Sequence, residues 1–133
     1  SYFYLYLDPS AKGLAEEIKR ETRDCEYTIL IREADNDVKL GISRVQKLLT
    51  FGMLNVSPRQ QNTIDEFGTY EYDKESIERG KEEPVKVDDH CMDAIRYLVM
   101  GMWSKLKPYL PAKEYEEIIR NPLNDEEDED EYI

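Results

Sequence analysis

The fold class is decided by residues 2–31, YFYLYLDPSAKGLAEEIKRETRDCEYTILI. The run Tyr2–Leu7 is apolar on both alternating faces and stops abruptly at Asp8-Pro9, which predicts a β-strand covered on both sides. A helix is expected over about Ser10–Arg23, and a second buried strand over Glu26–Ile31. Because a strand, a helix and a strand at this spacing form a right-handed crossover unit, we expect an α/β domain with parallel strands.

The patterns further along the chain predict mostly helices. The longest, about Val87–Leu106, places apolar residues from Met92 to Leu106 on one face at steps of three and four. In the helix expected at about 36–50, Val38, Ile42, Val45 and Leu49 form the buried stripe. The other expected elements are a short strand at 53–56, a helix from a capping box at Ser57 to about Tyr70, a mobile loop at 73–83 and a terminal helix at 112–120.

The chain is acidic, but its charge is unevenly distributed. The formal net charge is -12 over 133 residues, and Asp125–Glu131 is a run of acidic residues without Lys or Arg. Outside this run, 23 acidic residues face 18 basic ones, which leaves about -5. A mildly acidic body does not bind nucleic acid by charge alone, so any DNA binding must be local or assisted by metal ions.

Three other classes of protein are not indicated. No stretch approaches the roughly 20 apolar residues of a membrane span. Cys25 and Cys91 lack partners at metal-ligand spacing, which argues against a zinc site and favours a reducing cytoplasm. Gly80-Lys81 has Glu75 where a P-loop requires its first glycine, so these residues carry no P-loop ATPase.

Asp8 is the first candidate for chemistry, because it stands at the carboxyl end of the first strand. Ligands of open α/β sheets bind at this edge. An Asp-Pro pair before a helix is also typical of an N-cap followed by proline at the first helical position. The residues alone leave both interpretations open.

His90 and Asp93 are the second candidate, three residues apart on the last long helix. At about 100° per residue they lie roughly 60° apart, with Asp89 and Tyr97 bordering the same face. Such a pair can share a divalent metal ion, or the histidine can orient a water on it. A solvated helix face with acids in its first turn gives the same pattern.

Taken together, these segments resemble the C-terminal nuclease domain of the large terminase subunit of tailed bacteriophages, of the PBSX type. Residues 84–97, PVKVDDHCMDAIRY, are similar to the family's DH-x-x-D-A-x-R-Y signature near the end of the protein. Asp8-Pro9-Ser10-Ala11 matches the earlier strand-end motif. The remaining matches, in the family's order, are Ala34–Val38 with Gly41-Ile42, and then Glu66, Tyr70 and Asp73.

The resemblance implies an α/β domain with a partial RNase H-like fold over residues 1–120, with parallel strands, crossover helices and a long C-terminal helix. Residues 121–133 would be a disordered acidic tail. The implied activity is a divalent-metal-dependent endonuclease that cleaves concatemeric double-stranded DNA during packaging, in the host bacterial cytoplasm. Asp8 and Asp93 would bind Mg²⁺ or Mn²⁺ in a two-metal site. His90 would be a further ligand or would hold one of the ligands in place.

Three basic residues lie on the second expected helix. Lys39, Arg44 and Lys47 fall largely off its apolar stripe, so we expect a solvated face. Contact with a DNA backbone is the alternative role for these three side chains.

The sequence departs from the family at its start. A first strand with another metal-binding aspartate is missing, as is the upstream ATPase motor, so the metal site is expected to be incomplete. The strand Tyr2–Leu7 then has an open edge for dimerisation or for the upstream half. The implied partners are double-stranded DNA, that upstream half, and the portal or small terminase. The alternative function is a non-catalytic remnant that docks on terminase or capsid components.

Overall fold

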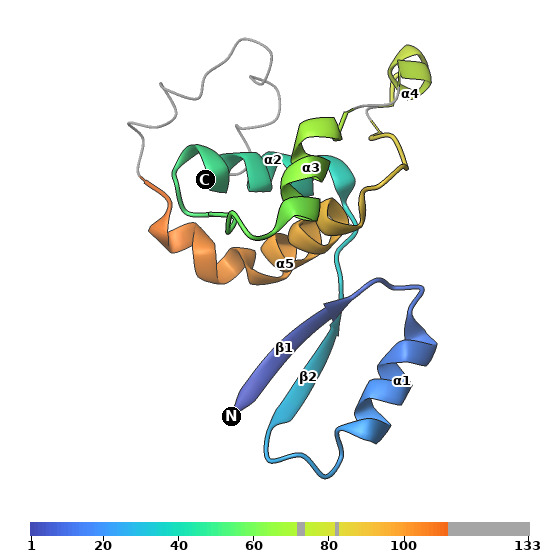
Figure 1. Ribbon diagram of the computed structural model, residues 1–133, viewed down its shortest axis with the longest axis vertical. Helices are drawn as coiled ribbons and strands as arrows, with labels where there is room; N and C mark the ends of the chain where they lie inside the picture. Colours follow the sequence, from blue (N-terminus) through green and yellow to red (C-terminus); the bar gives the residue numbers. More distant parts are fainter. Residues whose placement is uncertain (72–73, 82, 112–133) are drawn as a thin grey trace.

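The computed structural model describes residues 1–71, 74–81 and 83–111. The terminal helix expected at 112–120, the acidic tail at 121–133 and Asp73 lie outside the described residues. Figure 1 shows two groups of elements, with the strands and one helix at one end and the other long helices at the opposite end. In chain order the elements are β1 (Tyr2–Leu7), α1 (Lys12–Glu21), β2 (Thr28–Glu33), α2 (Val38–Thr50), α3 (Gln61–Thr69), α4 (Lys74–Glu78), α5 (His90–Leu106) and the 3₁₀ turn η1 (Lys107–Tyr109).

The two strands confirm the predicted parallel pairing. β1 and β2 run side by side in the register Tyr2↔Thr28 to Leu7↔Glu33, and α1 connects them. The second strand begins two residues later than expected, because the turn after α1 extends to Tyr27. The fold class is therefore α/β with a parallel crossover unit.

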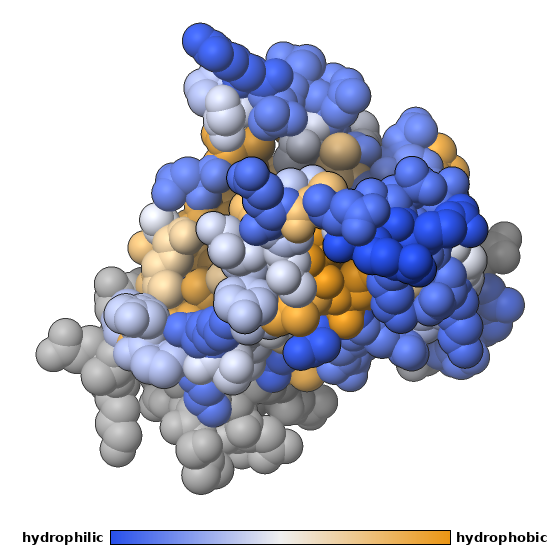
Figure 2. All heavy atoms as spheres, turned by 90° about the horizontal axis from the view of Figure 1, so that it is seen from below, coloured by the Kyte–Doolittle hydropathy of each residue, from blue (hydrophilic) through white to orange (hydrophobic). Residues whose placement is uncertain are grey.

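The prediction that β1 is covered on both sides is wrong for its first half. Tyr2 is 73% exposed, Phe3 55% and Tyr4 49%, whereas Leu5 to Leu7 are half-buried. In the described part of the chain the sheet has only these two strands. Near the carboxyl end of β1, the Tyr6 hydroxyl donates a hydrogen bond to the backbone of α5. Apolar composition predicted the strand, but it did not show how much of the strand its neighbours cover. On the face shown in Figure 2, hydrophobic patches (orange) interrupt the hydrophilic surface (blue).

The main core lies between the helices. α2 and α3 pack on α5, and the buried cluster joins Val45 and Leu48 of α2 to Val99 and Trp103 of α5. The predicted α2 stripe is right at Val45 but wrong at Leu49, which is 38% exposed while Leu48 is 2% exposed. The buried stripe is displaced because α5 lies over the Gly41–Val45–Leu48 side of α2.

Several boundaries differ from the expectations. No strand forms at 53–56, and α3 begins at Gln61 because Ser57 closes a turn, with its Oγ accepting from the Arg59 N–H at 3.3 Å. The expected loop at 73–83 contains the short helix α4. α5 begins at His90 rather than near Val87, and it ends at Leu106 as predicted. Among the described residues, no helix is both long and hydrophobic enough to cross a bilayer.

Candidate functional site

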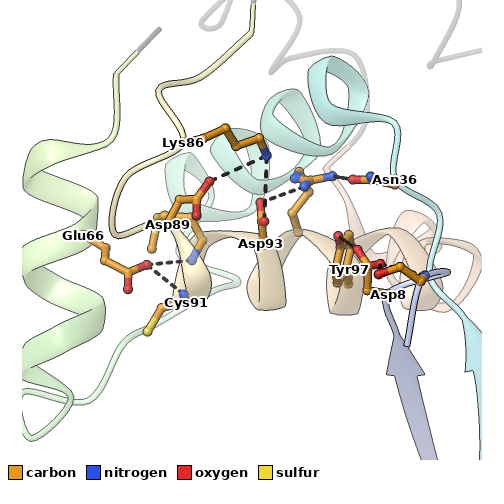
Figure 3. Close-up of polar contacts among 11 residues, drawn as sticks. Asp8, Asn36, Glu66, Lys86, Asp89, Cys91, Asp93 and Tyr97 are labelled. Carbon is orange, nitrogen blue, oxygen red and sulfur yellow. Dashed lines mark hydrogen bonds and ion pairs between the residues drawn. The ribbon is translucent and has the colours of Figure 1, made fainter. Parts of the chain in front are cut away.

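Asp8 lies in a turn directly after β1, and its side chain is turned toward α5 (Figure 3). Its Oδ1 accepts from the backbone N–H of Ser10 at 2.8 Å and also from the Ser10 hydroxyl. Its Oδ2 accepts from the Tyr97 hydroxyl at 2.6 Å. α1 begins only at Lys12, after Ala11 in the N-cap position, so the interpretation of Asp8-Pro9 as a helix N-cap is wrong.

The hydrogen bonds of Asp8 and the burial of Tyr97 shift the pKa values of both partners further away from neutral pH. The Ser10 and Tyr97 hydroxyls lower the pKa of Asp8 to about 2, because they stabilise its charged form. Burial, followed by the hydrogen bond to Asp8, raises the pKa of Tyr97 to about 12. At neutral pH the site therefore holds an ionised carboxylate that accepts from a protonated tyrosine.

Asp93 lies in the first turn of α5, and its side chain is 24% exposed. Its Oδ1 accepts from Nη2 of Arg96 at 2.8 Å. Its Oδ2 lies 3.9 Å from Nζ of Lys86, and the same ammonium lies 3.6 Å from Oδ2 of Asp89. His90 is the first residue of the helix and is exposed. Asp93 thus has a cationic neighbour at each of its carboxylate oxygens.

Arg96 joins Asp93 to the segment after β2. It is 1% exposed, and its Nη1 donates to Oδ1 of Asn36 at 2.9 Å while its guanidinium lies 5.0 Å from the centre of the Tyr97 ring. Its aliphatic stem lies so close to Gly41 that a β-carbon there would be 2.3 Å from Cγ. Sequence reasoning missed this role, although the spacing of Asp93 and Arg96 suits an ion pair along a helix.

Glu66 of α3 caps the start of α5 from a distance. Its Oε2 accepts from the backbone N–H of Cys91 at 2.7 Å and of Met92 at 3.0 Å, which lie in the first turn and have no acceptor within the helix. Asp89 stands at the N-cap position but makes no side-chain capping bond. The carboxylate of Glu66 is therefore engaged with the helix and is not directed at Asp93.

The three predicted site residues line one depression of about 500 Å³. It is bordered by the carboxyl half of β1, the start of α1 and the first turns of α5, and Asp8, His90, Asp93 and Tyr97 line it. Apolar side chains complete its wall, among them Leu98. Residues more than 80 positions apart in the sequence thus face one hollow.

Two carboxylates, those of Asp8 and Asp93, line the depression. Mg²⁺ is bound in proteins through one or two carboxylates together with waters and substrate phosphates, so the residue types are those that this ion takes. Within residues 1–71, 74–81 and 83–111, no group of three or more His, Cys, Asp and Glu side chains is placed to hold a metal ion. The described donors thus do not make a complete two-metal site, and Asp8 and Asp93 are the carboxylates that line the depression.

The expected solvated face of α2 is wrong for two of its three basic residues. Lys47 is 4% exposed, and the guanidinium of Arg44 stacks over the Trp103 ring at 4.7 Å with Nη1 3.3 Å from Sδ of Met100. Arg44 thus extends the interface between α2 and α5 through a cation–π contact. Lys39 is exposed as expected.

The family model and the solved structures that are similar to this chain all belong to terminases. Residues 10–100 match the family described as Terminase RNAseH like domain. The large terminase of a thermophilic bacteriophage, solved in complex with ADP, is similar at 33% identity and a TM-score of 0.63, over 71% of this chain and 22% of that one. Another crystal form of the same phage's large terminase is similar at 25% identity and a TM-score of 0.55, over 69% of this chain and 28% of that one. No curated protein matches. The chain spans less than a third of the length of these terminases, and it belongs to the terminase RNase H-like domain family.

Proposed function

We propose that this chain is a metal-dependent nuclease segment of a DNA-packaging terminase, which cleaves concatemeric double-stranded DNA in the host cytoplasm. One observation carries the proposal: Asp8, His90 and Asp93 line a single depression, although they lie at opposite ends of the described chain. Family membership supports the same reaction class. The metal proposed is Mg²⁺ or Mn²⁺.

The chain's own residues would bind the ion and orient the reactants. Asp8 is ionised at neutral pH, so its carboxylate requires no proton release before it binds a cation. Asp93 supplies the second carboxylate, and exposed His90 at the rim either joins the ligands or orients a water. When bound, a divalent ion activates the attacking water and neutralises charge on the phosphodiester. It would also offset the acidic charge that repels a DNA backbone.

The proposed activity depends on a further part of the terminase. Mg²⁺ sites that cut phosphodiesters commonly hold two ions about 3.5–4 Å apart, which needs more carboxylates than Asp8 and Asp93. We propose that the upstream half, with its ATPase motor, supplies the rest and pairs with the edge of β1 that β2 leaves open in the described residues. The portal or small terminase would be partners of the assembled protein.

Nicking of supercoiled plasmid DNA tests the proposal. The purified chain, alone and with the upstream half added, is incubated with Mn²⁺ and with EDTA. With the upstream half present, we expect Mn²⁺-dependent nicking that Asp8→Ala and Asp93→Ala abolish. Asp65→Asn is the matched control, because this acid lies exposed on α3 and does not line the depression. Nicking that persists in both alanine variants would contradict the proposal.

A non-catalytic docking module is the second candidate. It is favoured by the cationic groups at both oxygens of Asp93, since Arg96 and Lys86 already balance its charge. This candidate predicts no cleavage with Mn²⁺, even after the upstream half is added, together with unchanged binding to that half in Asp93→Ala.

A further inference from the structure

We propose that Tyr97 is a positioning residue for Asp8, whose hydroxyl fixes the direction in which the carboxylate presents Oδ2 to a cation shared with Asp93. The inference rests on the proposed function. It concerns a residue that would touch neither the metal nor the DNA and would act through Asp8. Figure 3 shows the Tyr97 side chain reaching from α5 to Asp8 at the end of β1.

The hydrogen bonds of Asp8 identify the oxygen that can bind a cation. A carboxylate oxygen has two lone pairs, and Oδ1 already accepts two hydrogen bonds from Ser10. Oδ2 accepts one, from Tyr97 at 2.6 Å, and so keeps a lone pair. The Tyr97 hydroxyl thus sets the orientation of the oxygen that remains available.

Tyr97 is itself held in place by the same arginine that holds Asp93. The Arg96 guanidinium lies 5.0 Å from the centre of the Tyr97 ring, and its Nη2 donates to Asp93 at 2.8 Å. Asn36 accepts from its other terminal nitrogen. One buried side chain therefore aligns Asp93 directly and Asp8 through the tyrosine.

A separate hydrogen bond holds β1 itself against α5. The Tyr6 hydroxyl donates to the Gly101 carbonyl at 3.2 Å, and this bond lies on the strand rather than on the turn that carries Asp8. The strand can thus stay attached to α5 when the Tyr97 hydroxyl is removed. That separation makes the positioning role distinguishable from a structural role.

The test is Mn²⁺ binding, measured by calorimetry and by the loss of the free-ion EPR signal. Removal of a partner that orients a metal ligand commonly lowers affinity 10–100-fold. We expect the dissociation constant for Mn²⁺ to rise at least about tenfold in Tyr97→Phe. Tyr109→Phe, at a side chain that is 78% exposed on η1, is the matched control and should leave it unchanged.

A double-mutant cycle shows whether Tyr97 acts through Asp8. In an Asp8→Asn background, Tyr97→Phe should cause no further loss of Mn²⁺ affinity, because the ligand that it orients is already altered. A Tyr97→Phe protein with a lower melting temperature but unchanged Mn²⁺ affinity would overturn the proposal and leave a purely structural bond. Equal losses in both backgrounds would also overturn it.

Failure of the proposed function gives a different result. If the wild-type chain binds no Mn²⁺, alone or with the upstream half, the metal site itself is contradicted, and the role of Tyr97 with it. If the wild type binds Mn²⁺ and Tyr97→Phe binds it equally well, only the positioning role is contradicted.

Discussion

Replacing Gly41 by alanine tests whether α2 and α5 are locked together through Arg96. A β-carbon at position 41 would lie 2.3 Å from Cγ and 2.6 Å from Cδ of Arg96. These atoms belong to the middle of a side chain that is 1% exposed and whose guanidinium is bonded to Asn36 and Asp93. The arginine therefore cannot move aside unless it gives up a hydrogen bond or the helices separate.

The two ways of accommodating the methyl group at position 41 have similar costs. Overpacking a filled interior destabilises by about 1–3 kcal/mol. Losing one hydrogen bond of a charged group costs about 1.5–3 kcal/mol. Alanine's higher helix propensity returns about 1 kcal/mol. We expect the free energy of unfolding of Gly41→Ala to be lower by about 0.5–2 kcal/mol.

Urea denaturation followed by circular dichroism and by fluorescence of Trp103, which lies in the core, gives the free energy of unfolding. Gly68→Ala is the matched control, because an added β-carbon on this α3 residue meets nothing within 4 Å. The control should be stabilised by about 0.5–1 kcal/mol. If Gly41→Ala matched the control, the close packing of Arg96 against α2 would be refuted.

Three further predictions concern the contact between β1 and α5 and the two carboxylates of the candidate site. A β-carbon at Gly101 would lie 2.2 Å from the Tyr6 ring, so Gly101→Ala should move β1 off α5, which a lower melting temperature and weaker Mn²⁺ binding would reveal. Lys86→Met removes an ammonium 3.9 Å from Asp93. Two unit charges at this distance in water interact by about 1 kcal/mol, so the affinity for Mn²⁺ measured by calorimetry should rise roughly fivefold. An unchanged affinity would contradict this prediction. The pKa of Asp8 falls from 3.8 to about 2 on folding, so its contribution to stability holds above pH 4 and is lost as the pH falls toward 2. The melting temperature of wild type should therefore drop more between pH 4 and pH 2 than that of Asp8→Asn, and equal drops would contradict the shift.

The order of elements could be predicted because local patterns determine it. Two apolar runs and the helix between them predicted the parallel pair, and a repeat at helical spacing predicted α5 and its end at Leu106. Burial was harder to predict. The exposed Tyr2 and the buried Lys47 both depend on which element lies opposite, and a single sequence carries no direct sign of that.

The sequence indicated the candidate ligands of the site, but not the hydrogen bonds that connect them to other residues. A strand end and a helical motif indicated Asp8 and Asp93, and both line one depression. The hydrogen bond from Tyr97 to Asp8 spans 89 positions, and the cap that Glu66 places on α5 spans 25. Bonds over such separations depend on how the helices pack, so local spacing could not have indicated them.

An anomalous difference map from crystals soaked in MnCl₂ would show whether Asp8 and Asp93 bind one cation together. We expect a peak within coordination distance, about 2 Å, of Oδ2 of Asp8 and of an oxygen of Asp93. A peak at only one of these carboxylates, or no peak at the depression while Mn²⁺ binds elsewhere on the chain, would contradict it.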